Sequence, residues 1–319
     1  MGNMEVVGFG ALNIDNIYRV RRILEDGESL ISEAGSFPGG SAANTIYGLS
    51  KLGINTGFIG AIGNDNHGKS LLLDFDKLGV ETRYIAVKPQ ERTGKTLCFS
   101  DNSGRRSIYI SPGANNLLSI DDINLSYINS AKYLHFSSFA DDRQFNLILK
   151  LIDQIAPSVK VSFSPGLLYA SKGIKTLAPI LSRIHILFMN QEELRTLVGR
   201  DVVSSSEICL EYGCRFIAIT LGQGVSLASG APPVVSYIRD SDNEYYIKPS
   251  DTKASCIDTT GAGDAFATGF LYGLINNKRL DECGQLGNIV ALFSIKKIGA
   301  RQGLPTITQL SKSYQDIYG

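Results

Sequence analysis

The chain is poor in the residue types that hold metal clusters or disulfide frameworks. It has no tryptophan, three histidines and five cysteines among its 319 residues. The cysteines form no CxxC pair, so the sequence indicates neither a zinc site nor a disulfide scaffold. Their odd number is typical of a protein from a reducing compartment. They are Cys98, Cys209, Cys214, Cys256 and Cys283.

An excess of one charge is also lacking. Lys plus Arg and Asp plus Glu number 31 each, so the formal net charge is zero. A balanced chain has no general electrostatic attraction for nucleic acid or an anionic membrane, and we expect neither as a partner. No apolar run is long enough to cross a bilayer, and residues 1–10 do not resemble a signal peptide. We therefore expect a cytoplasmic protein.

Short β-type runs alternate with helical patterns along most of the chain. This alternation predicts an α/β fold in which helices cover both faces of a mainly parallel sheet. Ligands bind such sheets beyond the carboxyl ends of the strands. The expected strands are 5–9, 56–62, 133–136, 159–163, 185–189, 216–220 and 225–228, and the expected helices are 41–51, 67–77, 143–155, 173–181, 191–197, 261–275 and 280–298.

Two segments, 15–37 and 84–110, interrupt the alternation with β-type runs. We interpret them as a small β lid on a single domain that spans residues 1–319. A lid over the strand ends would exclude water from a reaction site. Its exposed edge could pair with a second copy, so a homodimer through the lid is predicted. We interpret Arg105 and Arg106 as a solvated turn rather than as a contact for a phosphorylated substrate.

One glycine motif is misleading. Residues 63–70 read GNDNHGKS and match the P-loop pattern GxxxxGK[ST]. In a P-loop, Lys69 would reach the phosphates and Ser70 would bind magnesium. Asp65, however, would place a negative charge beside the phosphates, and no later strand ends in the acidic residue that completes such a magnesium site. We therefore favour a polar turn.

The most informative stretch is DTTGAGD at 258–264, which a helical pattern follows directly. Glycines permit a sharp turn, and the unpaired N–H groups at the start of a helix can hold an anion. A carboxylate beside a phosphate-binding turn suggests a base for phosphoryl transfer. The alternative is an ordinary loop in which Asp264 caps the helix.

Other motifs favour the phosphate site. Together with 258–264 they resemble, in chain order, the ribokinase-like family of sugar kinases, also called the phosphofructokinase-B type. The resemblance covers nearly the whole chain. It implies a ribokinase-like three-layer sandwich with a β lid, and transfer of the terminal phosphate of ATP to a hydroxyl of a sugar or nucleoside. The motifs are GALNID at 10–15, GGSAAN at 39–44, GAIGND at 60–65, NQEE at 190–193, TLGQG at 220–224 and GA at 299–300.

The resemblance assigns the reaction to the 258–264 stretch. It makes Asp264 the catalytic base, which would orient the hydroxyl and accept its proton as the O–P bond forms. Charge on the γ-phosphoryl oxygens would be held by an anion hole. The N–H groups of that hole belong to Gly261, Ala262 and Gly263.

The substrate side is implied at two other motifs. A carboxylate and a carboxamide suit the neighbouring hydroxyls of a sugar, and a glycine pair lets the backbone approach the ring. The residues concerned are Asp15, Gly39, Gly40 and Asn44. Taken without the family, the same residues would suit a helix start and a loop cap.

The nucleotide side is implied at Asn190, Thr220, Gly222, Gly224 and Asn288. Glu193 would hold Mg²⁺ through water, because Mg²⁺ prefers oxygen ligands and keeps several waters. Asn190 and Glu193 also have the spacing of a capping box, and both roles remain open.

A monovalent cation, potassium, is implied near the anion-hole loop. Asp258 and Thr260 would hold it together with backbone carbonyls close to Ser294, Gly299 and Gly303. The cation would order the loop.

The substrate does not follow from these motifs. Many sugar kinases of the family have an acidic residue after the strand that corresponds to 159–163, whereas this chain has Ser164-Pro165. We expect ATP-dependent phosphorylation of a small sugar. The alternatives are a nucleoside kinase, whose base pocket would be supplied by Phe37, Phe99, Tyr109 or Phe139, and a catalytically silent sugar-binding protein.

Overall fold

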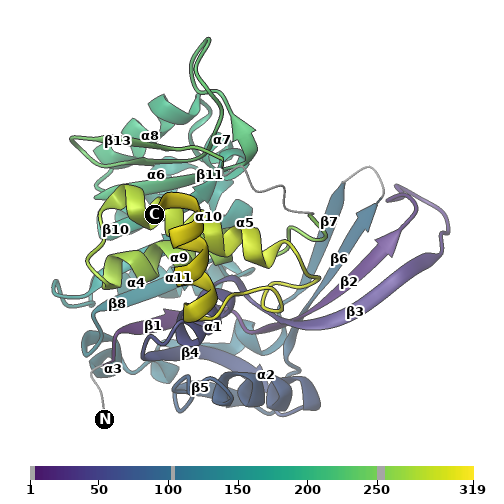
Figure 1. Ribbon diagram of the computed structural model, residues 1–319. Coiled ribbons are helices and arrows are strands. Elements are labelled where there is room, and N and C mark those ends of the chain that lie inside the picture. The colour runs from purple at the N-terminus through teal and green to yellow at the C-terminus, as the bar shows by residue number, and fades with distance from the viewer. Residues whose placement is uncertain (1–3, 102–104, 250–255) are drawn as a thin grey trace.

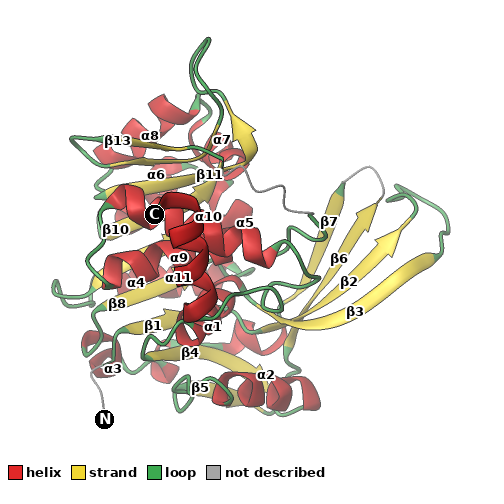
Figure 2. Ribbon diagram, viewed as in Figure 1, coloured by secondary structure: helices red, strands yellow, loops and turns green. Residues whose placement is uncertain are grey.

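A computed structural model describes residues 4–101, 105–249 and 256–319. Its centre is a nine-stranded sheet in the order β13-β12-β11-β10-β9-β8-β1-β4-β5, flanked by helices (Figures 1 and 2). The strands from β11 to β5 pair in parallel. This confirms the predicted α/β fold. The strands are β1 (Val6–Phe9), β4 (Thr56–Gly63), β5 (Ile85–Lys88), β8 (Tyr133–Ser137), β9 (Lys160–Ser164), β10 (Ile184–Asn190), β11 (Phe216–Val225), β12 (Val234–Arg239) and β13 (Glu244–Ile247).

Helices cover both faces of this sheet because the strands are apolar on both sides. β4 is buried at every residue, and in β1 Val6 belongs to one core cluster while Val7 and Phe9 belong to another. The first cluster is shared with α1 (Ser41–Lys51), α2 (Asn66–Asp76), α9 (Ala262–Ile275) and α10 (Leu280–Ser294). The second is shared with α3 (Leu125–Asn129), α4 (Asp142–Ile152), α5 (Gly166–Ala170), α6 (Ile174–Leu181), α7 (Gln191–Val198) and α8 (Val202–Glu211). Two 3₁₀ helices, Gly113–Leu117 and Ile120–Asp122, precede α3.

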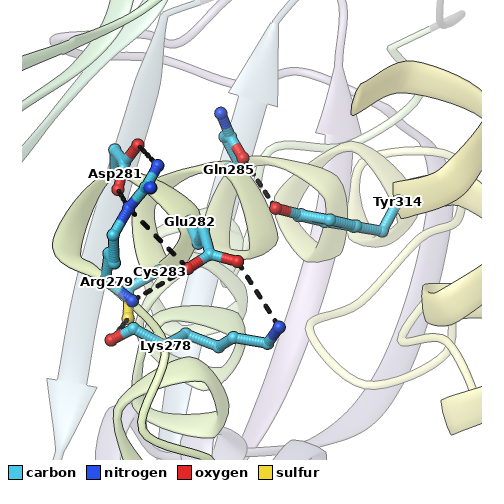
Figure 3. Close-up of polar contacts among 7 residues, drawn as sticks. All are labelled: Lys278, Arg279, Asp281, Glu282, Cys283, Gln285 and Tyr314. Atoms are coloured by element: carbon cyan, nitrogen blue, oxygen red, sulfur yellow. Dashed lines mark hydrogen bonds and ion pairs between the residues drawn. The ribbon is translucent and has the colours of Figure 1, made fainter. Parts of the chain in front are cut away.

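Polar contacts fix the start of α10 and its packing against α11 (Ile307–Tyr318). Glu282 accepts the backbone N–H of Arg279 (3.0 Å) and pairs with Lys278, as Figure 3 shows. One turn further on, the hydroxyl of Tyr314 in α11 donates to Gln285 (3.0 Å). These contacts hold the helix pair that covers α9.

A second sheet of four strands, in the order β3-β2-β6-β7, projects from the main body (Figure 1). It contains β2 (Asn13–Val20), β3 (Ile31–Gly39), β6 (Gly94–Asp101) and β7 (Arg106–Ser111). Its strands alternate in burial only weakly, and β7 is largely exposed. We call this sheet the lid.

Several expected boundaries are wrong. Residues 85–88 were expected in the lid, but they form β5 at the edge of the main sheet because they pair with β4. No separate strand covers 225–228; β11 continues to Val225, and its antiparallel partner is β12. The helix expected to reach residue 298 ends at Ser294. Among the helices of the described residues, none combines the length and the hydropathy required to span a membrane.

Candidate active site

The glycine turn before α9 is built as an anion site requires. Gly261 is the N-cap of α9 with φ of 74°, and a Cβ there would lie 2.4 Å from the Cβ of Ala300. Glycine is therefore required at this position for both its backbone angle and its lack of a side chain. Asp264 lies in the first helical turn and is not the N-cap, so the capping alternative is wrong.

The three expected N–H groups of the turn differ. The N–H of Ala262 donates to the carbonyl of Thr259 (3.2 Å). Those of Gly261 and Gly263 make no hydrogen bond to any described residue, and a Cβ on Gly263 would meet nothing within 4 Å. The structure thus leaves two donors, Gly261 and Gly263, for an anion.

Two side chains of α1 hold the Asp264 carboxylate. Ser41 Oγ donates to Oδ1 (2.7 Å), and Asn44 Nδ2 donates to Oδ2 (2.9 Å). Burial raises the pKa of Asp264 to about 6, and these two hydrogen bonds oppose the rise. A carboxylate with a pKa near 6 is ionised at neutral pH and is a better proton acceptor than an ordinary aspartate.

The substrate residues expected from the sequence lie at the base of the lid. Asp15, on β2, accepts a hydrogen bond from Thr96 Oγ1 of β6 (2.7 Å). A Cβ on Gly39 would lie 2.1 Å from the Asp15 carboxylate, and Gly40 has φ of 100°. Burial raises the pKa of Asp15. The glycine pair therefore lets the chain pass directly beside a carboxylate at the start of α1.

Arg301 is the main residue of the site that the sequence reasoning missed. It follows α10, its side chain is 2% exposed, and its guanidinium donates to Asn44 Oδ1 (2.9 Å). The same group donates to Asp74 (2.8 Å) and to the carbonyl of Gly39 (3.2 Å). Arg301 lies in the GARQGLP stretch at 299–305, whose GA dipeptide we had noted without this residue.

Asn190 and Thr220 are neighbours because they form the last pair in the parallel register of β10 and β11. Asn190 Oδ1 accepts the N–H of Glu193, and Glu193 Oε2 accepts the N–H of Asn190, both at 2.9 Å, so the capping box is present. Glu193 Oε1 makes no hydrogen bond to a described residue. Burial, and secondarily the charge of Asp264, raise the pKa of Glu193 to about 7.

The other expected nucleotide residues lie on β11 and α10. Gly222 and Gly224 have φ of 61° and 114° where the β11–β12 register shifts. Asn288 is 9% exposed, and its Nδ2 has no hydrogen-bond partner among the described residues. A buried amide donor without a partner suits a ligand contact.

Asp258 holds the anion-hole loop in place. Its Oδ1 accepts the N–H and the hydroxyl of Thr260 (2.9 and 2.7 Å), and its Oδ2 accepts the N–H of Gly299 (2.9 Å). Oδ1 thus binds its own loop, and Oδ2 ties that loop to the one that follows α10. The part of the chain that the structure describes contains no cluster of three or more His, Cys, Asp or Glu residues suited to a metal ion.

The lid contacts this loop, which corrects our interpretation of Arg106 as part of a solvated turn. Arg106 of β7 donates to the hydroxyls of Thr259 (3.0 Å) and Thr260 (2.9 Å). Arg105 pairs instead with Asp101 within the lid (2.9 Å). Phe37 of β3 packs against Gly299, where a Cβ would lie 2.9 Å from the ring.

A cavity of about 590 Å³ separates the lid from residues 256–259. It lies beside the glycine turn, and Asp264 and Asn44 are not part of its lining. Phe37 is part of it, whereas Phe139 is only 2% exposed and packs against Phe9. The lining includes Ile17, Arg19, Glu33, Phe37, Arg106, Ile257 and Ile298.

The P-loop alternative is wrong. Asp65 caps α2, and its carboxylate accepts the N–H groups of Gly68 (2.8 Å) and Thr93 (2.9 Å). In a P-loop the amide of Gly68 would face phosphate, whereas here the carboxylate of Asp65 already binds it.

Comparisons with known proteins agree with this geometry. The model of the pfkB family of carbohydrate kinases matches residues 3–307. An uncharacterized sugar kinase of Archaeoglobus fulgidus is 37% identical over 258 residues, which cover 81% of this chain and 98% of the relative. A ribokinase of Haemophilus influenzae is 28% identical over 311 residues, with 93% and 94% coverage.

Solved structures agree as well. The nucleoside kinase of Methanocaldococcus jannaschii is 25% identical with a TM-score of 0.80, and the match covers 99% of this chain and 100% of that one. The Arabidopsis thaliana ribokinase complexed with ribose and ATP is 23% identical with a TM-score of 0.80 over 98% of both chains, which shows a shared fold. The chain is a kinase that transfers phosphate to an alcohol group, and it belongs to the pfkB family of carbohydrate kinases.

Proposed function

We propose that the protein transfers the γ-phosphoryl group of ATP to a hydroxyl of a small sugar. The observation that carries this proposal is the position of Asp264. Its carboxylate follows the two unpaired N–H groups of Gly261 and Gly263 and is held by Ser41 and Asn44. A proton acceptor and an anion site thus adjoin each other at one helix start.

In the proposed reaction the hydroxyl oxygen bonds to the γ-phosphorus, and the bond from phosphorus to the oxygen bridging the β- and γ-phosphates breaks. The hydroxyl proton passes to the Asp264 carboxylate, and ADP leaves. The N–H groups of Gly261 and Gly263 stabilise charge on the transferred oxygens. Asp15 and Asn44, at the base of the lid, orient the sugar hydroxyls.

The nucleotide would bind along the ends of β10 and β11, near Asn190, Thr220, Gly222, Gly224 and Asn288. Glu193 would hold Mg²⁺ through water by way of Oε1, since Oε2 already accepts the N–H of Asn190. Bound Mg²⁺ would neutralise phosphate charge. Relatives support ATP as the donor, since one ribokinase structure is complexed with ribose and ATP.

We also propose a potassium site, with fewer side-chain ligands than the sequence suggested. Because both Asp258 oxygens already accept backbone N–H groups, those of Thr260 and Gly299, the direct ligands would be backbone carbonyls, and Asp258 and Thr260 would order them. Gly303 packs against the Ser294 carbonyl, which a Cβ would approach to 2.6 Å. Equal activity in KCl and NaCl at the same ionic strength would contradict this site.

The proposal is tested by a phosphoryl-transfer screen with Mg-ATP over pentoses, hexoses and nucleosides. We expect the largest kcat/KM with a sugar, and no turnover by the Asp264→Asn variant on the same acceptor. Phosphorylation of no acceptor by the wild-type protein would contradict the proposal.

A nucleoside is the second candidate substrate. The cavity of about 590 Å³ extends from the glycine turn under the lid and has Phe37 and three isoleucines in its lining. A pocket of this size with an aromatic ring and aliphatic side chains in its lining suits a base as well as a sugar ring. In the screen, a nucleoside preferred over every sugar by tenfold or more in kcat/KM would favour this candidate, on order-of-magnitude grounds.

A further inference from the structure

Arg301 carries a charge in the interior, where an unpaired guanidinium would be strongly destabilising. It lies in the loop between α10 and α11, which extends toward the base of the lid (Figure 1). Asp74 of α2 is its ionic partner at 2.8 Å. Its planar group lies 5.1 Å from the ring centre of Tyr47 and 5.2 Å from that of Phe75. The guanidinium is therefore fixed in both position and plane.

The two donors of Arg301 that do not face Asp74 point to the substrate side of the site. Nε donates to Asn44 Oδ1, and an NH2 nitrogen donates to the carbonyl of Gly39. Gly39 is the residue whose Cα lies against the Asp15 carboxylate. One side chain thus contacts both elements that would hold the sugar.

The contact with Asn44 has a chemical consequence. Arginine can only donate hydrogen bonds, so a neighbouring amide must turn its oxygen, and not its NH₂ group, toward the guanidinium. With Oδ1 toward Arg301, Nδ2 must face Asp264 Oδ2, to which it donates at 2.9 Å. The reversed amide would set an oxygen against the carboxylate and leave Asp264 Oδ2 without the donor that Asn44 supplies.

We propose that Arg301 is a positioning residue of the phosphoryl transfer: it fixes the amide orientation of Asn44, and through it the Asp264 carboxylate, while holding Gly39 beside Asp15. The proposal rests on the proposed function and adds a residue to it. Arg301 touches neither the phosphate nor the acceptor hydroxyl in this scheme. It positions the base through Asn44 and the Asp15 side through Gly39.

The charge of Arg301 provides a second measurable effect, on the pKa of Asp264. The charged groups that face Asp264 are Asp15 of β2, Glu193 of α7 and Arg301, whereas α1 contributes the uncharged Ser41 and Asn44. The positive charge of Arg301 holds the pKa of Asp264 below the value that burial alone would produce. Removing it should move the acid limb of the kcat profile to higher pH, because the base must be ionised to act.

The kinetic test uses Arg301→Gln and Arg301→Lys in the full chain, with the best acceptor from the screen. We expect Arg301→Gln to lower kcat/KM for the acceptor by about 100-fold, as misplacement by about 1 Å does, with KM for ATP within about twofold of wild type. Arg301→Lys should restore about tenfold of this loss, because lysine keeps the charge but not the fork of donors. Retention of kcat/KM within about threefold in Arg301→Gln would overturn the proposal.

A double-variant cycle separates positioning from folding. If Arg301 positions the base through Asn44, then kcat at saturating acceptor and at a pH well above the midpoint of Asp264 should be no lower in Asn44→Ala with Arg301→Gln than in Asn44→Ala alone. Losses that multiply would overturn the proposal. Arg239→Gln is the matched control, since Arg239 is also largely buried and paired, with Glu207 and Glu244, but on β12. It should lose stability and keep kcat.

A measurement without turnover keeps the two proposals distinguishable. Carbon-13 NMR of the Asp264 carboxyl, assigned with the Asp264→Asn variant, should titrate at higher pH in Arg301→Gln than in wild type. An unchanged midpoint would count against the role of Arg301 even if the kinase activity is confirmed. If no acceptor is phosphorylated, the proposed function fails, and this titration alone decides whether Arg301 controls the carboxylate.

Discussion

The cluster around Asp264 and the lid differ in how far their side chains are buried and in how they are held by polar contacts. In the cluster, Asn44 links Asp264 to the buried Arg301 through two 2.9 Å hydrogen bonds. In the lid, β7 leaves Ile108, Tyr109 and Ile110 41–62% exposed, and its link to the main body includes two hydrogen bonds from Arg106. The comparison indicates that the proposed proton acceptor is held by several buried polar contacts, whereas the outer strand of the lid is largely exposed.

The largest effect expected is at the proton acceptor. Asp264→Asn keeps the shape of the side chain but cannot take a proton, so kcat should fall by about 1,000-fold. Acceptor binding, measured by isothermal titration, should change little. Near-normal turnover would show that the rigid cluster does not carry the reaction.

The next effect concerns the glycine turn. Gly261→Ala places a Cβ against Ala300 at a residue with φ of 74°, so it should displace the anion-hole donors and lower kcat by about 100-fold. Gly53→Ala is the control: φ is 87°, and its Cβ would meet nothing within 4 Å. It should cost about 1 kcal/mol in the free energy of unfolding and leave kcat unchanged. Equal kinetics in both variants would contradict a role for the turn.

The pH dependence follows from the raised pKa of Asp264. The carboxylate is the active form, so kcat should be constant at high pH and fall as pH drops through about 6. Below that midpoint the loss should be about tenfold per pH unit. A profile that is flat from pH 7 down to pH 5 would contradict either the role of Asp264 or the rise in its pKa.

A smaller effect is expected where the lid meets the loop. Arg106→Gln removes the contacts with Thr259 and Thr260, so the lid should close less well and KM for the acceptor should rise by about fivefold. Arg105→Gln, which removes only a pair inside the lid, is the matched control. If both variants behave alike, the contact between lid and loop does not matter for binding.

The smallest kinetic effect concerns the lid edge. We propose that β7 pairs with its counterpart in a second copy, because it is an edge strand that carries exposed apolar side chains. Tyr109→Glu should convert a dimer to a monomer in analytical ultracentrifugation, with kcat within about twofold, since Tyr109 is exposed and is not part of the lining of the cavity. A wild-type monomer would contradict the dimer.

Most strands and helices of the main sheet were predicted correctly, because the hydrophobic pattern that specifies each one lies within a short stretch of sequence. The β4 run is apolar throughout, and the pattern after 261 has the period of a helix, so both elements were expected and are present. β12 and β13 were missed. They extend the sheet by antiparallel pairing, and the sequence of a strand does not show which strand it pairs with. β5 was assigned to the lid because its partner, β4, is distant in the chain from the segment that surrounds it.

The residues of the candidate site likewise fall into those that the sequence predicted and those that only the structure revealed. By itself the sequence determined the order of the glycine motifs, the identity of the reaction and the residues proposed to flank the phosphate, because each motif is a contiguous stretch with its own backbone requirement. Only the tertiary structure decided that Ala262 uses its N–H within the turn, that Arg106 reaches across from the lid, and that Arg301 orients Asn44 from 257 residues away. The partners of a buried charge depend on which groups lie close to it in the folded chain and on how its donors are oriented. A motif in the sequence carries no information about either.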